Sequence, residues 1–204
     1  VNASKEFDPS ELTGTIKIAV TPFLLSFIAT DLFKAIRKEA PNIQIQLLNW
    51  SKSTFQDLIN DDIQLGVHYD IAHAPKELIQ KYLVTDQYYV YMNREHPFSS
   101  EVMSINDSSE FEFATVIAAD WNSNISFVEK ILKLRGLQSN ITFRSELPSV
   151  LLDIVANTEM IYPSSGFLKI DEHTGIRRVP VLLDNEIING TNIDKIFIFG
   201  IGSN

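Results

Sequence analysis

The chain has 204 residues, of which 45% are hydrophobic and 21% are charged, so it can form one large domain or two small ones and is not a disordered segment. Its apolar runs are far shorter than the roughly 18 residues that cross a membrane, and the absence of cysteine from the sequence excludes disulfides and cysteine-based metal or nucleophile chemistry. A net charge of −9 without a basic stripe disfavours nucleic-acid binding by this chain itself.

Residues 15–40 are predicted to form a strand, a tight junction and a helix. Apolar β-branched residues alternate with polar or small ones over residues 15–20, and the period becomes helical after Pro22. At the carboxyl end of such a strand, the first turn of the helix points unpaired backbone N–H groups into the space above the sheet. The junction that ends at Phe23 is therefore a candidate ligand site.

The predicted helix over residues 22–40 carries an unusually wide apolar surface. Its Leu, Ile, Phe and Ala residues cover about half of the circumference, whereas one core-facing stripe needs roughly 100°. Either the helix is deeply buried, or it packs on its own sheet and also contacts another surface, such as a partner subunit. The pattern alone leaves both interpretations open.

Strands and helices alternate from this first strand to residue 67. Residues 43–47 alternate strictly between apolar and polar side chains, which is typical of a strand at a sheet edge or an interface. A Ser-x-x-Gln capping box at Ser53 and Gln56 predicts the start of a short helix, and residues 65–67 predict a short buried strand. Alternation of this kind predicts a parallel sheet with right-handed crossovers.

A second unit with the same order of elements follows. Residues 83–92 are dense in β-branched and aromatic side chains, which predicts a long strand that leaves the first unit. Ser126 with Glu129 predicts a capping box, and Gly136 predicts a helix end. The remaining predicted elements are strands at residues 113–118, 140–144, 159–162, 176–183 and 195–199, and helices at residues 122–136 and 148–156.

The motifs that would indicate catalysis on such a fold are absent from the sequence. It contains no Gly-x-Ser-x-Gly elbow, no Gly-Lys-Ser/Thr phosphate loop, no His-Glu-x-x-His motif and no dinucleotide fingerprint. His68 and His73 are too loosely spaced for a metal motif, and they fit a pocket wall or the surface better. We therefore predict no catalytic residue, no metal and no cofactor.

Polar side chains gather at four predicted junctions that follow strand ends, where small ligands bind in α/β folds. Ordinary capping and turn residues would give the same pattern at each junction taken singly. The hydroxyl groups suit a carboxylate or another polar head group, and the aromatic rings suit an apolar body. The candidate ligand-binding residues are Thr21, Pro22, Phe23, His68, Tyr69, Trp121, Asn122, Ser123, Ser164 and Ser165.

Several segments of the chain resemble the effector-binding domain of LysR-type transcriptional regulators. The similar segments are residues 12–18 (Leu-Thr-Gly-Thr-Ile-Lys-Ile), 38–41 (Lys-Glu-Ala-Pro), 65–67 (Leu-Gly-Val) and 96–98 (His-Pro-Phe). The resemblance covers nearly the whole chain. It implies an α/β fold with two Rossmann-like subdomains of the type 2 periplasmic-binding-protein kind and a ligand cleft between them.

The resemblance also implies how the chain divides and what it does. Residues 12–90 and 167–204 are expected to form the first regulatory subdomain, residues 91–166 the second, and residues 1–11 a linker remnant. A small-molecule effector, for example a small organic acid, would bind in the cleft and change the angle between the subdomains. Such a sensor is cytoplasmic, has no contact with a membrane, and reaches DNA only through an N-terminal winged helix-turn-helix domain that this chain lacks.

A homodimer or tetramer follows from the same resemblance, with the first helix and second strand of one copy against a helix of the partner's other subdomain. This arrangement matches the wide apolar surface of the first helix. A periplasmic solute-binding protein of a transport system shares the architecture and is the alternative function. The expected interface residues are Phe27, Ile28, Phe33, Ile36, Ile45, Val128 and Leu132.

Overall fold

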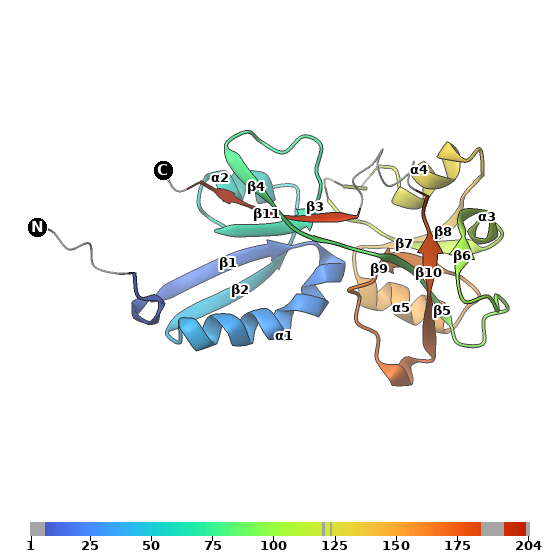
Figure 1. Ribbon diagram of the computed structural model, residues 1–204, viewed down its shortest axis with the longest axis horizontal. Helices are drawn as coiled ribbons and strands as arrows, with labels where there is room; N and C mark the ends of the chain where they lie inside the picture. The colour runs from blue at the N-terminus through green and yellow to red at the C-terminus, as the bar shows by residue number, and fades with distance from the viewer. Residues whose placement is uncertain (1–6, 120, 123, 185–193, 203–204) are drawn as a thin grey trace, which may run out of the picture.

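The computed structural model describes residues 7–119, 121–122, 124–184 and 194–202. Two α/β units lie side by side, here called the first and second units, and the chain passes between them more than once (Figure 1). The elements in chain order are η1 (Pro9–Glu11), β1 (Gly14–Val20), α1 (Pro22–Glu39), β2 (Ile43–Asn49), α2 (Thr54–Ile59), β3 (Leu65–Tyr69), β4 (Leu78–Thr85), β5 (Tyr88–Asn93), β6 (Met103–Ser104), α3 (Ile105–Ser108), β7 (Glu112–Val116), α4 (Phe127–Leu134), β8 (Asn140–Ser145), α5 (Pro148–Ala156), β9 (Tyr162–Ser165), η2 (Glu172–Thr174), β10 (Ile176–Leu182) and β11 (Lys195–Ile201).

The first unit is built on a five-stranded sheet in the order β2-β1-β3-β11-β4. β1 pairs in parallel with β2 and β3, as predicted, whereas β11 runs antiparallel to both of its neighbours. Successive residues of a strand point to opposite faces. Ile18 and Val20 accordingly pack in the core with α1, while Ala19 packs in a separate cluster with Leu58 of α2. The sheet therefore carries one helix on each face.

The second unit combines a four-stranded sheet, β6-β10-β5-β9, with the parallel pair β7-β8. A parallel bridge between Phe113 of β7 and Ile161 joins the two sheets. The helix α5 covers β5, β7 and β8, and its Leu151 and Val155 are fully buried. The predicted order of parallel strands and helices is thus confirmed in this unit.

The chain crosses from the first sheet to the second at Asp86 and Gln87. The long strand predicted over residues 83–92 is interrupted there, because β4 belongs to the first sheet and β5 to the second. The chain returns to the first sheet only at β11, since β10 pairs with β5 and β6. Strand pairing places β5 and β10 in one sheet, and the division at residues 90/91 and 166/167 that the resemblance implies stays a prediction.

Local capping explains where α4 begins and ends. Ser126 and Glu129 form the predicted capping box, in which each side chain bonds the other residue's backbone N–H. Gly136 follows the helix with a φ of 68°, a left-handed conformation that favours glycine. The helix predicted over residues 122–136 is therefore confined to Phe127–Leu134.

Two other local expectations have a different outcome. The capping box predicted at Ser53 and Gln56 is wrong, because the Ser53 side chain makes no cap hydrogen bond and its Oγ donates to Asp57 Oδ2 at 2.8 Å. Within the predicted linker remnant at residues 1–11, residues 1–6 lie outside the described residues. In the rest of that segment, Pro9–Glu11 form the single turn η1, and Asp8 is its N-cap.

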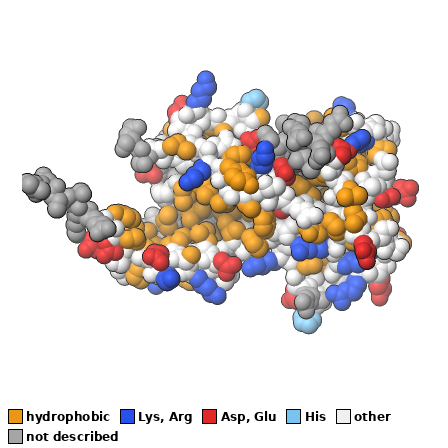
Figure 2. Space-filling model, in the orientation of Figure 1, with side chains coloured by type: hydrophobic (Ala, Val, Ile, Leu, Met, Phe, Trp, Pro, Cys, Tyr) orange, Lys and Arg blue, Asp and Glu red, His pale blue; other side chains and the backbone are white. Residues whose placement is uncertain are grey.

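The helix α1 runs along the lower edge of the first unit in Figure 1, beside β2. Of its 18 residues only Phe23 and Leu24 are buried, and Phe33 is 53% exposed. The interpretation that this helix is deeply buried is therefore wrong, and its outer side is open. Figure 2 shows hydrophobic side chains gathered over the first unit on the face drawn. Neither α1 nor any other helix of the described residues is long and apolar enough to span a membrane.

We predict that Gly66→Ala destabilises the chain by about 1–3 kcal/mol through overpacking. A Cβ at Gly66 would lie 2.7 Å from Cζ3 of Trp50, which is closer than van der Waals contact allows. Chemical denaturation measures the change. The matched control is Gly200→Ala in the same sheet, where the nearest atoms are 3.5 Å away and stability should stay within about 0.5 kcal/mol. Equal effects of the two substitutions would contradict the overpacking argument.

Candidate functional site

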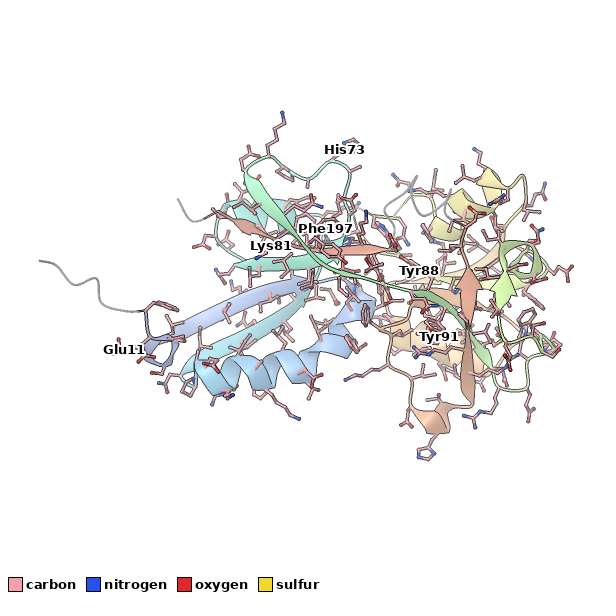
Figure 3. All side chains as sticks on the ribbon, viewed as in Figure 1. Glu11, His73, Lys81, Tyr88, Tyr91 and Phe197 are labelled. Atoms are coloured by element: carbon pink, nitrogen blue, oxygen red, sulfur yellow. The ribbon has the colours of Figure 1, made fainter. Side chains whose placement is uncertain are left out.

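An inner pocket lies between the two units, where the end of β1 meets the ends of β7 and β9. Tyr88, labelled in Figure 3, joins it from the start of β5, directly after the crossing between the units. The cavity volume is only about 20 Å³, which is room for about one water molecule. Its lining residues are Phe23, Tyr88, Thr115, Val116, Trp121, Asn122, Phe127, Val128, Pro163, Ser164 and Ser165.

An outer groove of about 610 Å³ lies next to the inner pocket, and its volume is in the range of typical ligand sites. The first unit supplies Phe55 and residues 70–73, which follow β3, and the second unit supplies the exposed side of α4 with Lys130. Trp121 and Phe127 line both the groove and the inner pocket. These two rings are therefore the wall between a roomy, solvent-facing space and a small buried one.

Four rings form an aromatic cluster at this wall, and we define it as Tyr69, Tyr88, Trp121 and Phe127. Trp121 stacks on Tyr69 with centroids 5.2 Å apart and planes at 19°, and on Phe127 with centroids 5.5 Å apart and planes at 15°. Tyr88 stacks on Phe127 at 5.5 Å. Such offset stacking contributes about 0.5–1.5 kcal/mol per pair beyond burial. The cluster links the end of β3 in the first unit to α4 in the second.

Two threonine hydroxyls near the pocket have no hydrogen-bond partner among the described residues. Thr21 is fully buried and stands before α1 at the N-cap position, yet its side chain makes no cap hydrogen bond. Thr115 is 4% exposed, and this residue of β7 lines the inner pocket. A buried hydroxyl without a partner costs roughly 1–3 kcal/mol. Both hydroxyls therefore keep unused hydrogen-bonding capacity within the described residues.

His68 is held neutral beside these groups. Burial lowers its pKa to about 4. Its Nδ1 lies 3.2 Å from the carbonyl oxygen of Tyr69, which can only accept, so Nδ1 carries the proton and Nε2 is an acceptor. Nε2 has no partner among the described residues. His68 thus adds an unused hydrogen-bond acceptor at the end of β3, the strand next to β1.

Asp86 joins the segments that pass between the units. The Tyr69 hydroxyl donates to its carboxylate, and the backbone N–H of Gly166 donates to the same carboxylate at 3.1 Å. The backbone N–H of Asp86 donates to the carbonyl of Asp194 at 2.6 Å. Burial raises the pKa of Asp86, while these hydrogen bonds act in the opposite direction. One side chain therefore connects β3, the crossing after β4 and the turn after β9.

The structure brings half of the predicted ligand residues together in the inner pocket. Phe23, Trp121, Asn122, Ser164 and Ser165 line the inner pocket. Thr21, Pro22, His68 and Tyr69 lie at the adjoining ends of β1 and β3, next to Phe23 in the fold or the sequence, and are not among the residues that line the pocket. Ser123 lies outside the described residues.

Some of these side chains already have structural partners. The amide of Asn122 accepts from the N–H of Ala118 at 2.6 Å and donates to the carbonyl of Val116 at 2.8 Å, so it holds the turn after β7. Ser164 Oγ bonds the Tyr162 hydroxyl at 3.1 Å. Asn122 is therefore a residue that shapes the pocket, and its polar atoms are not free for a ligand.

Six lining residues were not predicted as ligand-binding residues, namely Tyr88, Thr115, Val116, Phe127, Val128 and Pro163. Thr115 carried a signal, because it is the one hydroxyl inside the apolar strand at residues 113–116. Tyr88 was hidden in the predicted long strand. The packing of Phe127 beneath Trp121 depends on the turn between them and has no local signature.

The expected interface residues fall into three groups. Phe33 is exposed on α1, while Ile28 and Ile36 are half-buried on its inner side. Phe27 contacts Phe167 with ring centroids 4.9 Å apart. Val128 and Leu132 are only 8% and 2% exposed, because they point into the core of the second unit, so these two residues are corrected to core positions. The exposed apolar residue of α4 is Leu134, and Ile45 is half-buried on the edge strand β2.

No group of three or more His, Asp or Glu residues among those described is arranged to hold a metal ion.

The LysR substrate binding domain profile matches residues 9–162. A relative, the HTH-type transcriptional activator NagR of Ralstonia sp., is 25% identical over 135 residues, which are 65% of this chain and 43% of NagR. The chain thus spans less than half the length of that protein.

Solved structures of regulators share the fold. A probable transcriptional regulator from Pseudomonas aeruginosa superposes with a TM-score of 0.78 at 18% identity, over 97% of this chain and 64% of that one. The cofactor-binding domain of the Cbl transcriptional regulator superposes with a TM-score of 0.73 at 14% identity, over 100% of this chain and 86% of that one. These likenesses confirm the predicted fold of two Rossmann-like subdomains of the type 2 periplasmic-binding-protein kind.

We predict that burial of neutral His68 makes the chain less stable as the pH falls from 6.5 to 4. The unfolded state then binds a proton that the folded state excludes, so about 3 kcal/mol of stability is lost across this window and none further below it. Urea denaturation at several pH values, compared between the wild type and His68→Gln, isolates this contribution. The exposed His173→Gln is the matched control and should keep the wild-type slope. A wild-type slope in His68→Gln would show that His68 is not the group responsible.

Proposed function

Since this chain belongs to the LysR substrate-binding domain family, we propose that it is the effector-binding part of a LysR-type transcriptional regulator. It binds a small molecule between its two units and passes the change to an oligomer that controls DNA binding. It acts by binding and not by catalysis. A regulator of DNA acts where the genome is, so we assign the protein to the cytoplasm of a bacterium.

The observation that carries this proposal is the pair of buried hydroxyls without a partner. Thr21 follows β1 in the first unit, two residues before Phe23 of the inner pocket, and Thr115 lines that pocket from β7 of the second unit. A polar ligand between them satisfies both groups at once. The half-buried and exposed apolar residues of α1 and β2 support an oligomer, which we propose is a dimer or tetramer.

The crossing at Asp86 is the element through which binding changes the arrangement of the units. The chain passes from β4 to β5 there, and the carboxylate also bonds Tyr69 and Gly166. A ligand that contacts both sides of the cleft favours the arrangement in which both contacts are made. A difference in binding free energy of about 1.4 kcal/mol changes the equilibrium tenfold.

The alternative function, a periplasmic solute-binding protein for transport, is not favoured. The matching family profile and the relatives described above are those of transcriptional regulators.

We also propose that the division into units follows the strand pairing, with the first unit formed by β1 to β4 and β11 and the second by β5 to β10. A DNA-reading domain belongs to the proposed full regulator.

We predict that Thr21→Val and Thr115→Val each weaken effector binding about three- to tenfold, the effect of losing one hydrogen bond. Thermal shift identifies an effector from a small-molecule library, and calorimetry measures its affinity. Melting temperature should stay the same or rise, because neither hydroxyl has a partner among the described residues.

The matched control for these variants is Thr54→Val, a buried threonine whose Oγ1 accepts from the backbone N–H of Ser51 at 2.8 Å. This variant should lose stability and retain effector affinity. An effector that binds both cleft variants as tightly as the wild type would refute the site.

We predict that the chain is a dimer at micromolar concentration and that Phe33→Asp makes it a monomer of 23.1 kDa. Phe33 is 53% exposed on α1, so the charge disrupts an apolar interface without disturbing the core. Light scattering measures the mass. The matched control is Tyr82→Asp on β4, where the side chain is 54% exposed outside the proposed interface, and this variant should remain a dimer. A monomeric wild type would overturn the assembly.

A further inference from the structure

Trp121, one of the two residues that separate the outer groove from the inner pocket, is stacked between two other aromatic rings. The Trp121 indole bridges Tyr69 of the first unit and Phe127 of the second, with planes at 19° and 15° to theirs. It also lies 6.0 Å from the ring of Phe23 at the start of α1. The space between the units is thus already occupied by a flat aromatic group that the chain supplies.

The volumes of the inner pocket and the outer groove show how the Trp121 ring limits access. The inner pocket holds about 20 Å³, while the groove on the other side of Trp121 and Phe127 holds about 610 Å³. A pocket of 20 Å³ has room for about one water molecule and cannot admit an effector. A molecule that reaches the hydroxyl of Thr115 from the groove must therefore displace the indole.

The chemistry around the ring limits what can replace it. Aromatic faces from Tyr69, Phe127 and Phe23 surround the indole. Thr115 and Ser164 are among the residues that line the inner pocket, on the other side of this ring from the groove. Among the described residues that line this pocket, none is Lys or Arg. The inner pocket therefore provides stacking surfaces and uncharged hydrogen-bonding groups, while Lys130 lines the outer groove and Arg144 donates to the carbonyl of Asn122 at 2.9 Å.

We propose that the effector is a planar aromatic molecule with a hydrogen-bonding substituent, and that its ring takes the place of the Trp121 indole between Tyr69 and Phe127. The substituent reaches Thr115 and Ser164 in the inner pocket. This proposal rests on the proposed function, because it names the ligand class of the same cleft. Two stacked faces favour a flat ring over a puckered one of the same size.

The test uses three matched pairs of probes, each with one polar group on a flat or a saturated ring. The pairs are benzamide with cyclohexanecarboxamide, phenol with cyclohexanol, and benzoate with cyclohexanecarboxylate. Calorimetry on the wild-type chain at up to about 10 mM probe detects millimolar dissociation constants. The aromatic member of at least one pair should bind about tenfold more tightly than its saturated partner.

Tryptophan fluorescence reports whether the indole moves. The sequence holds two tryptophans, so Trp50→Phe leaves Trp121 as the single reporter, and an aromatic probe should change its emission. Trp121→Ala should strengthen binding of that probe about tenfold, because no indole must be displaced. If Trp50→Phe does not fold, the comparison of Trp121→Ala with the wild type by calorimetry decides the question.

Three results would overturn the proposal: no aromatic member binds, saturated members bind as tightly, or Trp121→Ala weakens aromatic binding. The proposed function fails differently. A non-aromatic ligand whose affinity falls in Thr115→Val would leave the cleft as the effector site and reject the aromatic class alone. A ligand that is insensitive to changes at Thr21, Thr115 and Trp121 would reject both.

Discussion

The carboxylate of Asp86 is the constraint on which the arrangement of the two units depends. It is 5% exposed, it lies where the chain leaves the first sheet, and it accepts from Tyr69 and from the backbone of Gly166. Burying a carboxylate is costly unless hydrogen bonds compensate, and the raised pKa of Asp86 shows that burial dominates here. The chain retains this cost at a position where one side chain holds β3, the crossing and the turn after β9 together.

Close backbone approach completes this connection. A Cβ at Gly166 would lie 2.7 Å from the carbonyl oxygen of Gln87, so only glycine allows the turn after β9 to lie against the crossing. The N–H of Gly166 donates to that carbonyl at 2.8 Å, and Arg178 donates to the carbonyl of Gly166 at 2.7 Å. Packed contacts of this kind have discrete arrangements and do not deform continuously. The turn after β9 and the crossing are therefore held against each other by backbone contacts that leave little room for gradual adjustment.

The sequence predicts most of the fold and about half of the site, and the division has a physical basis. Period, capping residues and Gly136 are local signals, so β1, α1, α4 and the parallel strand order were predictable. The pairing of β10 with β5 was not, because a strand pattern does not name its partner. Likewise, the sequence shows that Val128 of α4 is apolar, but it does not show that this side chain points into the core. Strand ends predicted Thr21 and Trp121, whereas Tyr88 enters the pocket only through the crossing beside it.

The position of the two unpartnered threonines explains how binding could be converted into a signal. Each hydroxyl costs roughly 1–3 kcal/mol while it lacks a partner, and a ligand recovers this free energy only if it reaches the group. Thr21 is fixed to the first unit and Thr115 to the second. A ligand that bonded one of them would gain affinity but would favour no arrangement of the units, however tightly it bound. A ligand that bonds both recovers the second contribution only when the units are correctly spaced, so the difference in affinity between arrangements comes from the second hydrogen bond.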